Sequence, residues 1–544
     1  MWPLFFACIL PFAVLFGSIF LLRKSVFWSA TAALAVLLVV LVALWQVPGA
    51  TILAALVKSS LVTVDIVAIL FAALFLVALL QEVGAISVIK NVLVSVSPDR
   101  RIQTLLIGVF FVGFIEGIAG FGTPAMLAAP LLVVIGFPVR GAILISLLGN
   151  TLSTAFGAVG TPFLIGLTQG IAPFLSSPEG LVTGLTLQQV LLYFVAVGLP
   201  AALIFPLVMV VLLTTTFGGN WKDGLAVWKH ALLAALCYCI PFYSIALIFG
   251  FEFPALLGSL IGGIAFILLL KLPFFAIKHP WTFADVKSKK TQPISAKKSN
   301  SHYSTQTKIL ASIPYTFTVF FLILSRIPNL PFNAIAQSTG AVTVSQVAGV
   351  QVQHTLRPLY SPALYLLLGT LAALIIYKPG GKKIRGLLTA TLSKMSKPAI
   401  TLSALIFLAQ LLLFSGNNSA GNPSIPVFCA KMVSTIPIAW PLVAPFIGMF
   451  GALIAGSVTV SNILFAGFQA EAALVGKFSI PLVLALQVLG ATGGNIIALH
   501  NIIAVLAATD SKISERNMLV LLIKPALVYG LFLGLFGYLL HVLQ

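Results

Sequence analysis

The residues with the clearest chemical potential lie in the stretch Gly113 to Pro124, GFIEGIAGFGTP, where four glycines and a proline interrupt an apolar run around one carboxyl group, Glu116. Glycine and proline disfavour a smooth helix. Irregular backbone at membrane depth is tolerated only where it is buried in protein or lines a wet cavity. We therefore expect a binding site here; the alternative is a glycine-rich face for helix packing with Glu116 at an interfacial end.

Three residues are candidates for proton coupling. Ionisable groups at membrane depth are rare and usually mark an ion or proton path. Because desolvation favours the neutral form of a carboxyl group, Glu116 could load a proton on one side and release it on the other. Asp65 lies at a comparable depth in its own apolar run, and His500 is the only histidine well inside one. Each also has a structural alternative: a hydrogen-bonded neutral Glu, a solvated Asp and a core histidine.

Three further apolar stretches are interrupted by small or polar residues: GNTLSTAFGAVGTP at 149–162, AGSVTVSN at 455–462 and LGATGGNIIALHN at 489–501. An opened helix N-terminus offers unpaired N–H groups and a partial positive charge, which suit a small anion. Hydroxyl and amide groups add hydrogen bonds, so the four interruptions together suit a small hydroxylated carboxylate. The predicted substrate-binding residues are Gly120, Gly122, Thr123, Asn150, Thr151, Ser153, Ser457, Thr459, Ser461, Asn462, Thr492, Gly493 and Asn495. In the alternative interpretation these polar residues only hold helices together.

Composition places these stretches in an all-α polytopic membrane protein. Of the 544 residues 60% are hydrophobic and 8% are charged, and the mean hydropathy is +1.14, far from the roughly 25% charged residues of a soluble domain. The net charge of +19 does not indicate nucleic-acid binding, because the basic residues lie in short loops between apolar stretches. The four cysteines show no paired spacing, so we predict neither a disulfide framework nor a zinc site, and no cofactor.

The apolar stretches predict about 12 transmembrane helices and two re-entrant helical hairpins. The predicted spans lie near 3–22, 26–46, 61–80, 141–168, 188–216, 230–250, 254–277, 309–325, 363–377, 398–414, 480–508 and 518–541. The hairpins are predicted at 102–138 and 437–475, each with arms of about twelve residues, or about 18 Å, which reach mid-bilayer. If each arm crosses fully, the chain has fourteen spans. We expect Glu82, Glu179, Glu252 and Asp223, near span ends, to be solvated.

The order of these elements predicts an inverted repeat. Three spans, a hairpin and two spans occupy 1–216 and return in 309–544, while two linking spans and a basic loop occupy 217–308. Most of the 30 Lys and Arg residues fall on one side if both termini are outside, which is the orientation that the positive-inside rule predicts. The two repeats then have opposite orientation, as in secondary transporters with binding sites at the midplane.

Several of these segments resemble the L-lactate permease family of bacterial carboxylate transporters. The resemblance rests on GFIEGIAGFGTP at 113–124, GFPVRGA at 136–142, AFGAVGTP at 155–162, the segment 456–469 and TGG with the following residues to Asn501. It implies uptake of L-lactate, glycolate or a related 2-hydroxymonocarboxylate with protons across the bacterial cytoplasmic membrane. It also implies hairpins that belong to a moving, elevator-type transport domain.

The chain departs from that family's pattern at three places. Val458 stands where members commonly have Asp, the stretch from Asn495 to Leu499 is uncharged where several carry Lys, and Leu499 replaces a frequent Pro. These differences imply that Glu116 and His500 carry more of the proton traffic. Sodium coupling in the same architecture, a passive channel and a membrane-embedded enzyme are the alternatives. Against an enzyme, the sequence has no HExxH motif and no GxSxG motif with plausible partners. The oligomeric state is left open.

Overall fold

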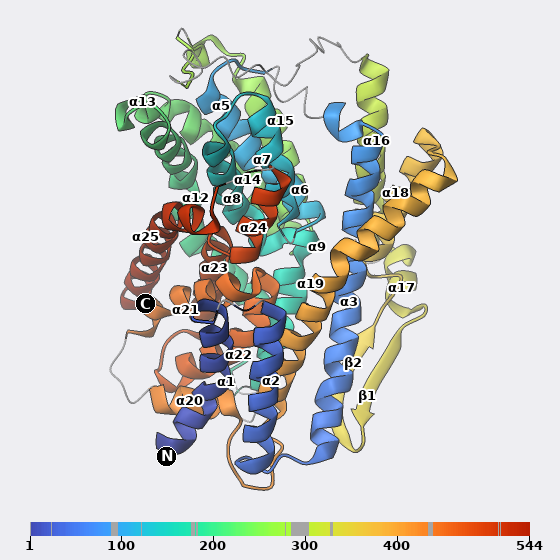
Figure 1. Cartoon of the computed structure of the whole chain (residues 1–544), viewed down its shortest axis with the longest axis vertical. Coiled ribbons are helices and arrows are strands. Elements are labelled where there is room, and N and C mark those ends of the chain that lie inside the picture. The colour runs from blue at the N-terminus through green and yellow to red at the C-terminus, as the bar shows by residue number, and fades with distance from the viewer. Residues whose placement is uncertain are drawn as a thin grey trace.

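The computed structural model describes residues 2–544 except 23, 25, 89–95, 121, 176–179, 181, 182, 278, 284–303, 327–329, 434–438, 510 and 512. The described residues form helices and one β-hairpin (Figure 1). The first half contains α1 (Trp2–Phe20), α2 (Val26–Ala43), α3 (Gly49–Glu82), α5 (Arg100–Leu105), η1 (Leu106–Phe111), α6 (Val112–Ile118), α7 (Thr123–Val134), α8 (Val139–Ser153), η2 (Thr154–Phe156), α9 (Gly157–Thr161), η3 (Pro162–Leu167), α10 (Thr168–Leu175) and α12 (Leu187–Thr216). The linking region contains α13 (Trp221–Leu225), α14 (Trp228–Phe249), η4 (Pro254–Gly258), α15 (Ser259–Leu269) and η5 (Pro273–Phe275). The second half contains α16 (Thr305–Arg326), α17 (Pro331–Ser338), β1 (Val342–Val347), β2 (Val350–Leu356), α18 (Pro362–Tyr377), α19 (Gly381–Phe414), α20 (Ile425–Val433), α21 (Trp440–Ala455), α22 (Val458–Val475), α23 (Ile480–Ile496), α24 (Leu499–Ala508) and α25 (Glu515–Val542).

All twelve predicted spans fall on helices, but two helices are much longer than predicted. In the described part of the chain, nine helices are long and apolar enough to cross a membrane, and six shorter apolar helices accompany them. Both α3 and α19 have 34 residues, which corresponds to about 51 Å and exceeds the roughly 30 Å of a hydrocarbon core. They pack against each other along their length. Composition finds the apolar centre of such a helix but not its polar extensions.

Both predicted hairpins reverse direction at a break, although the first break is shorter than predicted. The helix that starts at Arg100 continues through Gly113 and Gly117 to Ile118, giving a candidate span of 19 residues, or about 28 Å. The expectation of arms of about twelve residues is therefore wrong for this arm, while α7 has 12 residues. Gly113 and Gly117 are contact positions, because a Cβ at Gly117 would lie 2.6 Å from Cα of Leu256. Glycine here allows close helix packing.

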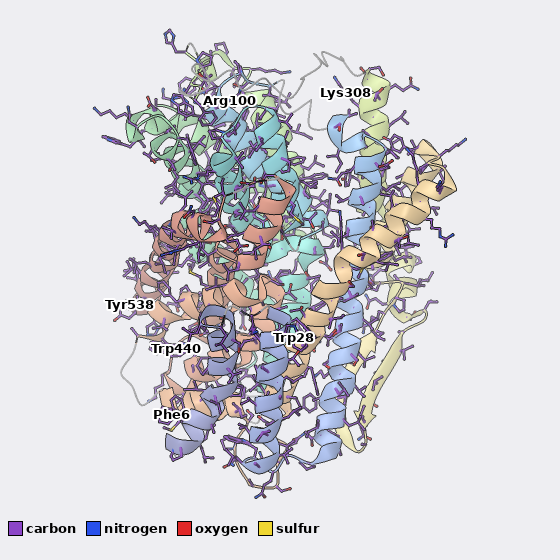
Figure 2. All side chains as sticks on the ribbon, in the orientation of Figure 1. Phe6, Trp28, Arg100, Lys308, Trp440 and Tyr538 are labelled. Atoms are coloured by element: carbon purple, nitrogen blue, oxygen red, sulfur yellow. The ribbon has the colours of Figure 1, made fainter. Side chains whose placement is uncertain are left out.

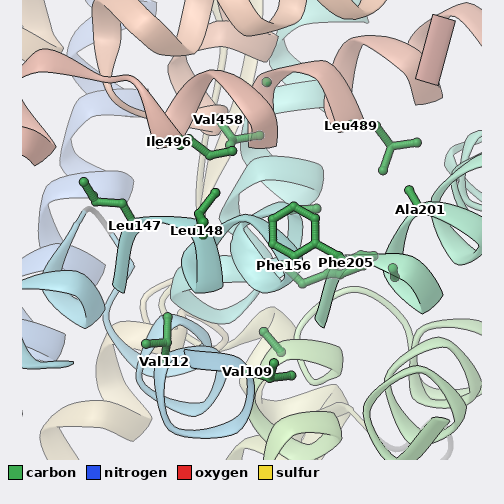
Figure 3. Packing of buried hydrophobic residues seen from close by; sticks show 14 of the residues in the cluster. Val109, Val112, Leu147, Leu148, Phe156, Ala201, Phe205, Val458, Leu489 and Ile496 are labelled. Atoms are coloured by element: carbon green, nitrogen blue, oxygen red, sulfur yellow. The ribbon is translucent and has the colours of Figure 1, made fainter. Parts of the chain in front are cut away.

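Hydrophobic packing joins the two halves of the sequence. The largest cluster of buried apolar side chains combines 102–283 with 440–533, so α8 and α12 pack against α23 and α25. Figure 3 shows Leu147, Leu148 and Phe156 of the first half beside Val458 and Ile496 of the second. A second cluster holds α1, α2, α3, α19 and α20 together, and a third packs α3 against α16 and α18. In Figure 1, α3, α16, α18 and the β-hairpin lie on one flank, away from α12 and α25.

Loops from distant parts of the sequence meet at the two ends of the molecule. At one end, Lys383 Nζ lies 3.1 Å from Glu82 Oε1, and Arg101 donates to the carbonyl oxygen of Asp223 at 2.8 Å. At the other, the Trp45 indole donates to the carbonyl oxygen of Pro423 at 3.0 Å. Arg100 and Lys308 lie at the first end and Phe6 at the opposite end (Figure 2). The contacts pair loops that the charge pattern assigns to one side.

Candidate functional site

The break in the first hairpin covers Ala119 to Gly122. Gly120 and Gly122 adopt φ values of +57° and +78°, in the left-handed region that favours glycine. A Cβ at Gly122 would collide with the Asn501 side chain, and one at Gly120 would lie 3.0 Å from Cβ of Ala158. Both glycines are therefore required by backbone conformation and by close approach of segments far apart in sequence.

The second break, between α8 and η3, contains the most strained backbone of the region. Ala158, Val159 and Gly160 have φ values of 41°, 56° and 77°. For a β-branched residue such as Val159 a positive φ is a genuine outlier, and such residues cost roughly 1–3 kcal/mol each. Strain of this kind persists only where the surrounding structure enforces it, and it concentrates at functional sites. The predicted interruption at 149–162 is confirmed, with its centre at 158–160.

The third break, between α21 and α22, contains a left-handed glycine and a helix cap. Gly456 has a φ of 56°, and the Ser457 side chain accepts a hydrogen bond from the Val460 backbone N–H at 3.4 Å. The α22 helix of 18 residues therefore begins at Val458. Its first turn presents unpaired N–H groups and a partial positive charge.

The fourth break lies within the predicted stretch 489–501 but after the binding residues predicted there. The α23 helix runs through the TGG motif and ends at Ile496, and α24 begins at Leu499. We expected Thr492, Gly493 and Asn495 at an opened helix N-terminus. That expectation is wrong, because they lie in the last turns of α23. The glycines fit a continuous helix because they allow close packing: a Cβ at Gly493 would lie 2.8 Å from the Tyr529 ring.

Three of the breaks and the last turn of α23 meet around one cavity. It is lined by Glu116, Gly120, Thr154, Gly157, Ala158, Thr161, Pro162, Gly456, Ser457, Val458, Thr459 and Asn495, and its volume is about 20 Å³, room for about one water molecule. The first three breaks each contribute at least one residue, and α23 contributes Asn495 just before the fourth break. Both halves of the chain also touch each other at its edge, where the hydroxyl oxygens of Thr161 and Thr459 are 3.4 Å apart.

Among the described residues, Glu116 is the only ionisable side chain that lines this cavity. It is 1% exposed, its Oε2 has no hydrogen-bond partner among the described residues, and its carboxyl group is hydrogen-bonded to the Asn150 side chain. Gly157 lies against it so closely that a Cβ would collide with Glu116 Oε1. The other polar groups that line the cavity are the start of α22, hydroxyls and the Asn495 amide. Donors of this kind bind small anions without a basic residue.

Of the predicted substrate-binding residues, Gly120, Ser457, Thr459 and Asn495 line the cavity. Others hold the surrounding helices. Asn462 Nδ2 donates to the carbonyl oxygen of Pro162 at 3.0 Å, Ser461 Oγ donates to that of Gly448 at 2.8 Å, and Thr492 Oγ1 to that of Leu489 at 2.7 Å. The hydroxyl of Ser153 is 3.4 Å from the carbonyl oxygen of Asn150. The hydroxyls of Thr123 and Thr151 are buried without a hydrogen-bond partner in the described structure.

The other two candidates for proton coupling lie elsewhere or outside the description. Asp65, partly exposed in the middle of α3, lies 3.0 Å from the buried His354 ring on β2. It therefore fastens the β-hairpin to α3 and does not line the cavity. His500 is the second residue of α24, but its side chain lies outside the described residues.

Sequence reasoning missed several residues. Thr154 and Thr161 line the cavity, although only residues near them were predicted to bind substrate. The sequence around them, Ala-Phe-Gly at 155–157 and Gly-Thr-Pro at 160–162, was the pattern that could have identified them. Gln469 and Gln487 lie in a buried polar network that reaches Trp440 and Ser461. Glu252, which we expected to be solvated, is 7% exposed and packs near the 158–160 break. Loop position alone does not reveal such burial.

A family comparison decides the class of protein. The model of the L-lactate permease family matches residues 5–544, nearly the whole chain. This chain belongs to the L-lactate permease family. Membership makes it a multi-pass membrane transporter.

Individual members of the L-lactate permease family match at low identity over most of their length. An L-lactate permease of Streptococcus iniae is 29% identical over 411 residues, covering 75% of this chain and 77% of that protein. The glycolate permease of Escherichia coli K12 is 26% identical, covering 86% and 83%. The L-lactate permease of the same strain is 25% identical, covering 96% and 93%.

Proposed function

We propose that this permease takes up L-lactate or a related small 2-hydroxymonocarboxylate such as glycolate together with protons across the bacterial cytoplasmic membrane. The names of the relatives support the substrate class. The observation that carries the proton coupling is that Glu116 lines the same cavity as the N-terminus of α22.

The substrate's carboxylate accepts hydrogen bonds from the first turn of α22, where N–H groups and the helix dipole favour an anion. Its 2-hydroxyl bonds to the hydroxyl pair of Thr161 and Thr459, which lie within 3.4 Å of each other. This arrangement uses both halves of the chain, so the site is complete only when the halves are packed together.

Proton coupling follows because Glu116 and the substrate's carboxylate carry the same charge when both are ionised. An ionised Glu116 and a bound carboxylate would repel each other in a cavity of low dielectric constant. The anion is therefore bound best when Glu116 is protonated, and each ligand favours binding of the other. Coupled binding of this kind is what a symporter requires.

The proposed architecture is an inverted repeat of 1–216 and 309–544 with two re-entrant hairpins, which carry the site in an elevator-type transport domain. Its support is that the breaks at 119–122 and 456–457 meet at one cavity. Both termini lie outside in this proposal, as the distribution of basic residues predicts. The contact of Trp45 with Pro423 supports the assignment of these two loops to one side of the membrane, but not the choice of that side.

Uptake of labelled L-lactate into proteoliposomes tests the function. With an inward proton gradient, choline in place of sodium and glycolate as competitor, we expect accumulation that a protonophore abolishes and glycolate reduces. Absence of gradient-driven uptake would contradict the proposed proton coupling. Accumulation that needs sodium would favour the sodium-coupled alternative. Uptake that never exceeds equilibrium would indicate a passive channel.

A further inference from the structure

A group of buried, unpaired polar atoms extends from Glu116 to residues that do not line the cavity. Besides Glu116 Oε2, it contains Asn150 Oδ1, Ser259 Oγ and the Tyr238 hydroxyl, all on residues no more than 2% exposed. None of these atoms has a hydrogen-bond partner in the described part of the chain. Asn150, Ser259 and Tyr238 do not line the cavity.

Helix packing places this group next to Glu116. Gly113 lies one turn before Glu116 on the same face of α6, and a Cβ built there would collide with Ser259 Oγ and lie 3.6 Å from Ser153 Cβ. Asn150 is hydrogen-bonded to the Glu116 carboxyl group. Three elements, α6, α8 and α15, therefore surround these atoms.

Tyr238 reaches the same region from α14. Its ring stacks on Phe242 with centroids 4.8 Å apart and lies 6.4 Å from the Phe110 ring. A Cβ at Gly262, one turn after Ser259 in α15, would collide with the carbonyl oxygen of Cys237, the residue before Tyr238. The ring contacts hold the hydroxyl in place. A phenylalanine would make the same ring contacts, so packing alone does not explain the hydroxyl.

Buried polar groups are nearly always hydrogen-bonded, and several unpaired ones in one region mark a place for ordered water. We propose that Ser259 and Tyr238, with bridging water, form a proton relay between Glu116 and the buried interface of α6 with α15, outside the cavity. This inference rests on the proposed proton-coupled function. Glu116 gives its proton to a water, which passes one of its own to the next hydroxyl, and each hydroxyl accepts one proton and donates one.

Other ionisable groups near the relay are few. The elements that pack against α6 are η1, α7, α8, η2, α9, η4 and α15. In their described residues the only formally charged side chain is Arg140, at the start of α8 and ten residues before Asn150. Glu252, just before η4, is a second buried carboxyl group near the 158–160 break. Glu116 is thus the carboxyl group placed to exchange protons with both the cavity and the relay.

Two transport modes separate a relay from a structural role. Gradient-driven uptake needs Glu116 to release its proton in every cycle, whereas exchange of internal for external lactate lets the carrier return with its proton bound. We therefore compare Ser259→Ala and Tyr238→Phe with Ser146→Ala in proteoliposomes. Ser146 is a matched control, since it is equally buried and its hydroxyl already donates to the carbonyl oxygen of Ala142 at 2.6 Å.

For Ser259→Ala and Tyr238→Phe we expect gradient-driven uptake to fall about tenfold or more, with exchange within about twofold of wild type. Ser146→Ala should keep both rates. If both relay variants keep gradient-driven uptake, or if correctly folded variants lose uptake and exchange in parallel, the relay is refuted. Failure of wild type to respond to a proton gradient would instead overturn the proposed function. Size-exclusion profiles in detergent establish folding, and Tyr238→Phe still tests the relay if Ser259→Ala does not fold.

Discussion

At the scale of single residues, Glu116 combines burial with two different neighbourhoods. The carboxyl group lines the cavity and is hydrogen-bonded to Asn150, and Ser259 packs against Gly113, one turn earlier on the same face of α6. No other ionisable residue in the described structure has this position. The assignment of proton coupling therefore depends on one side chain, and substitutions there are decisive.

Replacing Glu116 with glutamine should separate transport from its driving force. Glutamine keeps the size and hydrogen bonding of a protonated glutamate but cannot release a proton. We expect Glu116→Gln to lose proton-driven accumulation while lactate exchange stays within about threefold of wild type. Accumulation at the wild-type level, measured in proteoliposomes, would show that Glu116 has a structural role and does not couple transport to protons.

Gly157 should be equally intolerant for a steric reason. A Cβ at this position would collide with Glu116 Oε1, so Gly157→Ala must displace the carboxyl group or the strained segment that follows. We expect uptake to fall at least about tenfold, because displaced catalytic or binding groups commonly cost that much. Gly386→Ala is the control: this glycine is exposed in α19, and nothing lies within 4 Å of a Cβ there. Equal activity of the two variants would argue against tight packing at Glu116.

At the scale of elements, the sequence predicted where helices break better than what the breaks do. Gly120, Gly122 and Gly456 mark real interruptions because left-handed backbone strongly favours glycine. Gly113, Gly117 and Gly493 look the same in sequence but lie in continuous helices, where another chain segment approaches too closely for a side chain. Only the tertiary structure distinguishes the two uses of glycine.

The β-hairpin illustrates a second limit. The apolar pattern predicted no element at 342–356, and Asp65 was interpreted as a candidate for proton coupling. Pairing of Asp65 with His354 joins positions 289 residues apart, and no local pattern predicts such a contact. Asp65, which is partly exposed, thereby has a structural partner and needs no role in transport.

We predict that Asp65→Asn weakens the attachment of the β-hairpin to α3 and leaves proton-driven uptake within about twofold of wild type. The pair is partly exposed, so its loss should change stability by no more than about 1 kcal/mol. Limited proteolysis should show faster cleavage within 342–356. Loss of proton coupling in this variant, with the hairpin still protected, would return Asp65 to the proton path.

At the scale of the whole molecule, the charge pattern predicts the orientation, and the structure tests only which segments lie at the same end. Loops assigned inside, such as those with Glu82 and Lys383, contact each other, and so do loops assigned outside, such as those with Trp45 and Pro423. The repeat itself was predicted from element order alone. The packing of 102–283 against 440–533 could not be, because low-complexity apolar helices do not reveal their partners.

Single-cysteine labelling tests the orientation. In a background with the four native cysteines replaced by serine, Ser419→Cys should react with a membrane-impermeant maleimide in intact cells. Lys382→Cys should react only after permeabilisation. The reverse pattern would invert the orientation and place both termini inside.

The central claim is that a small carboxylate and the Glu116 proton bind in one cavity, and the pH dependence of lactate affinity tests it most directly. Lactate stays an anion between about pH 5 and about pH 9, so a change in its affinity over this range reports a group on the protein. Binding to the purified wild-type protein should weaken as pH rises, by up to about tenfold per pH unit once Glu116 ionises. Binding to Glu116→Gln should be nearly independent of pH. A wild-type affinity that does not change with pH, or an equal slope in the variant, would contradict the account.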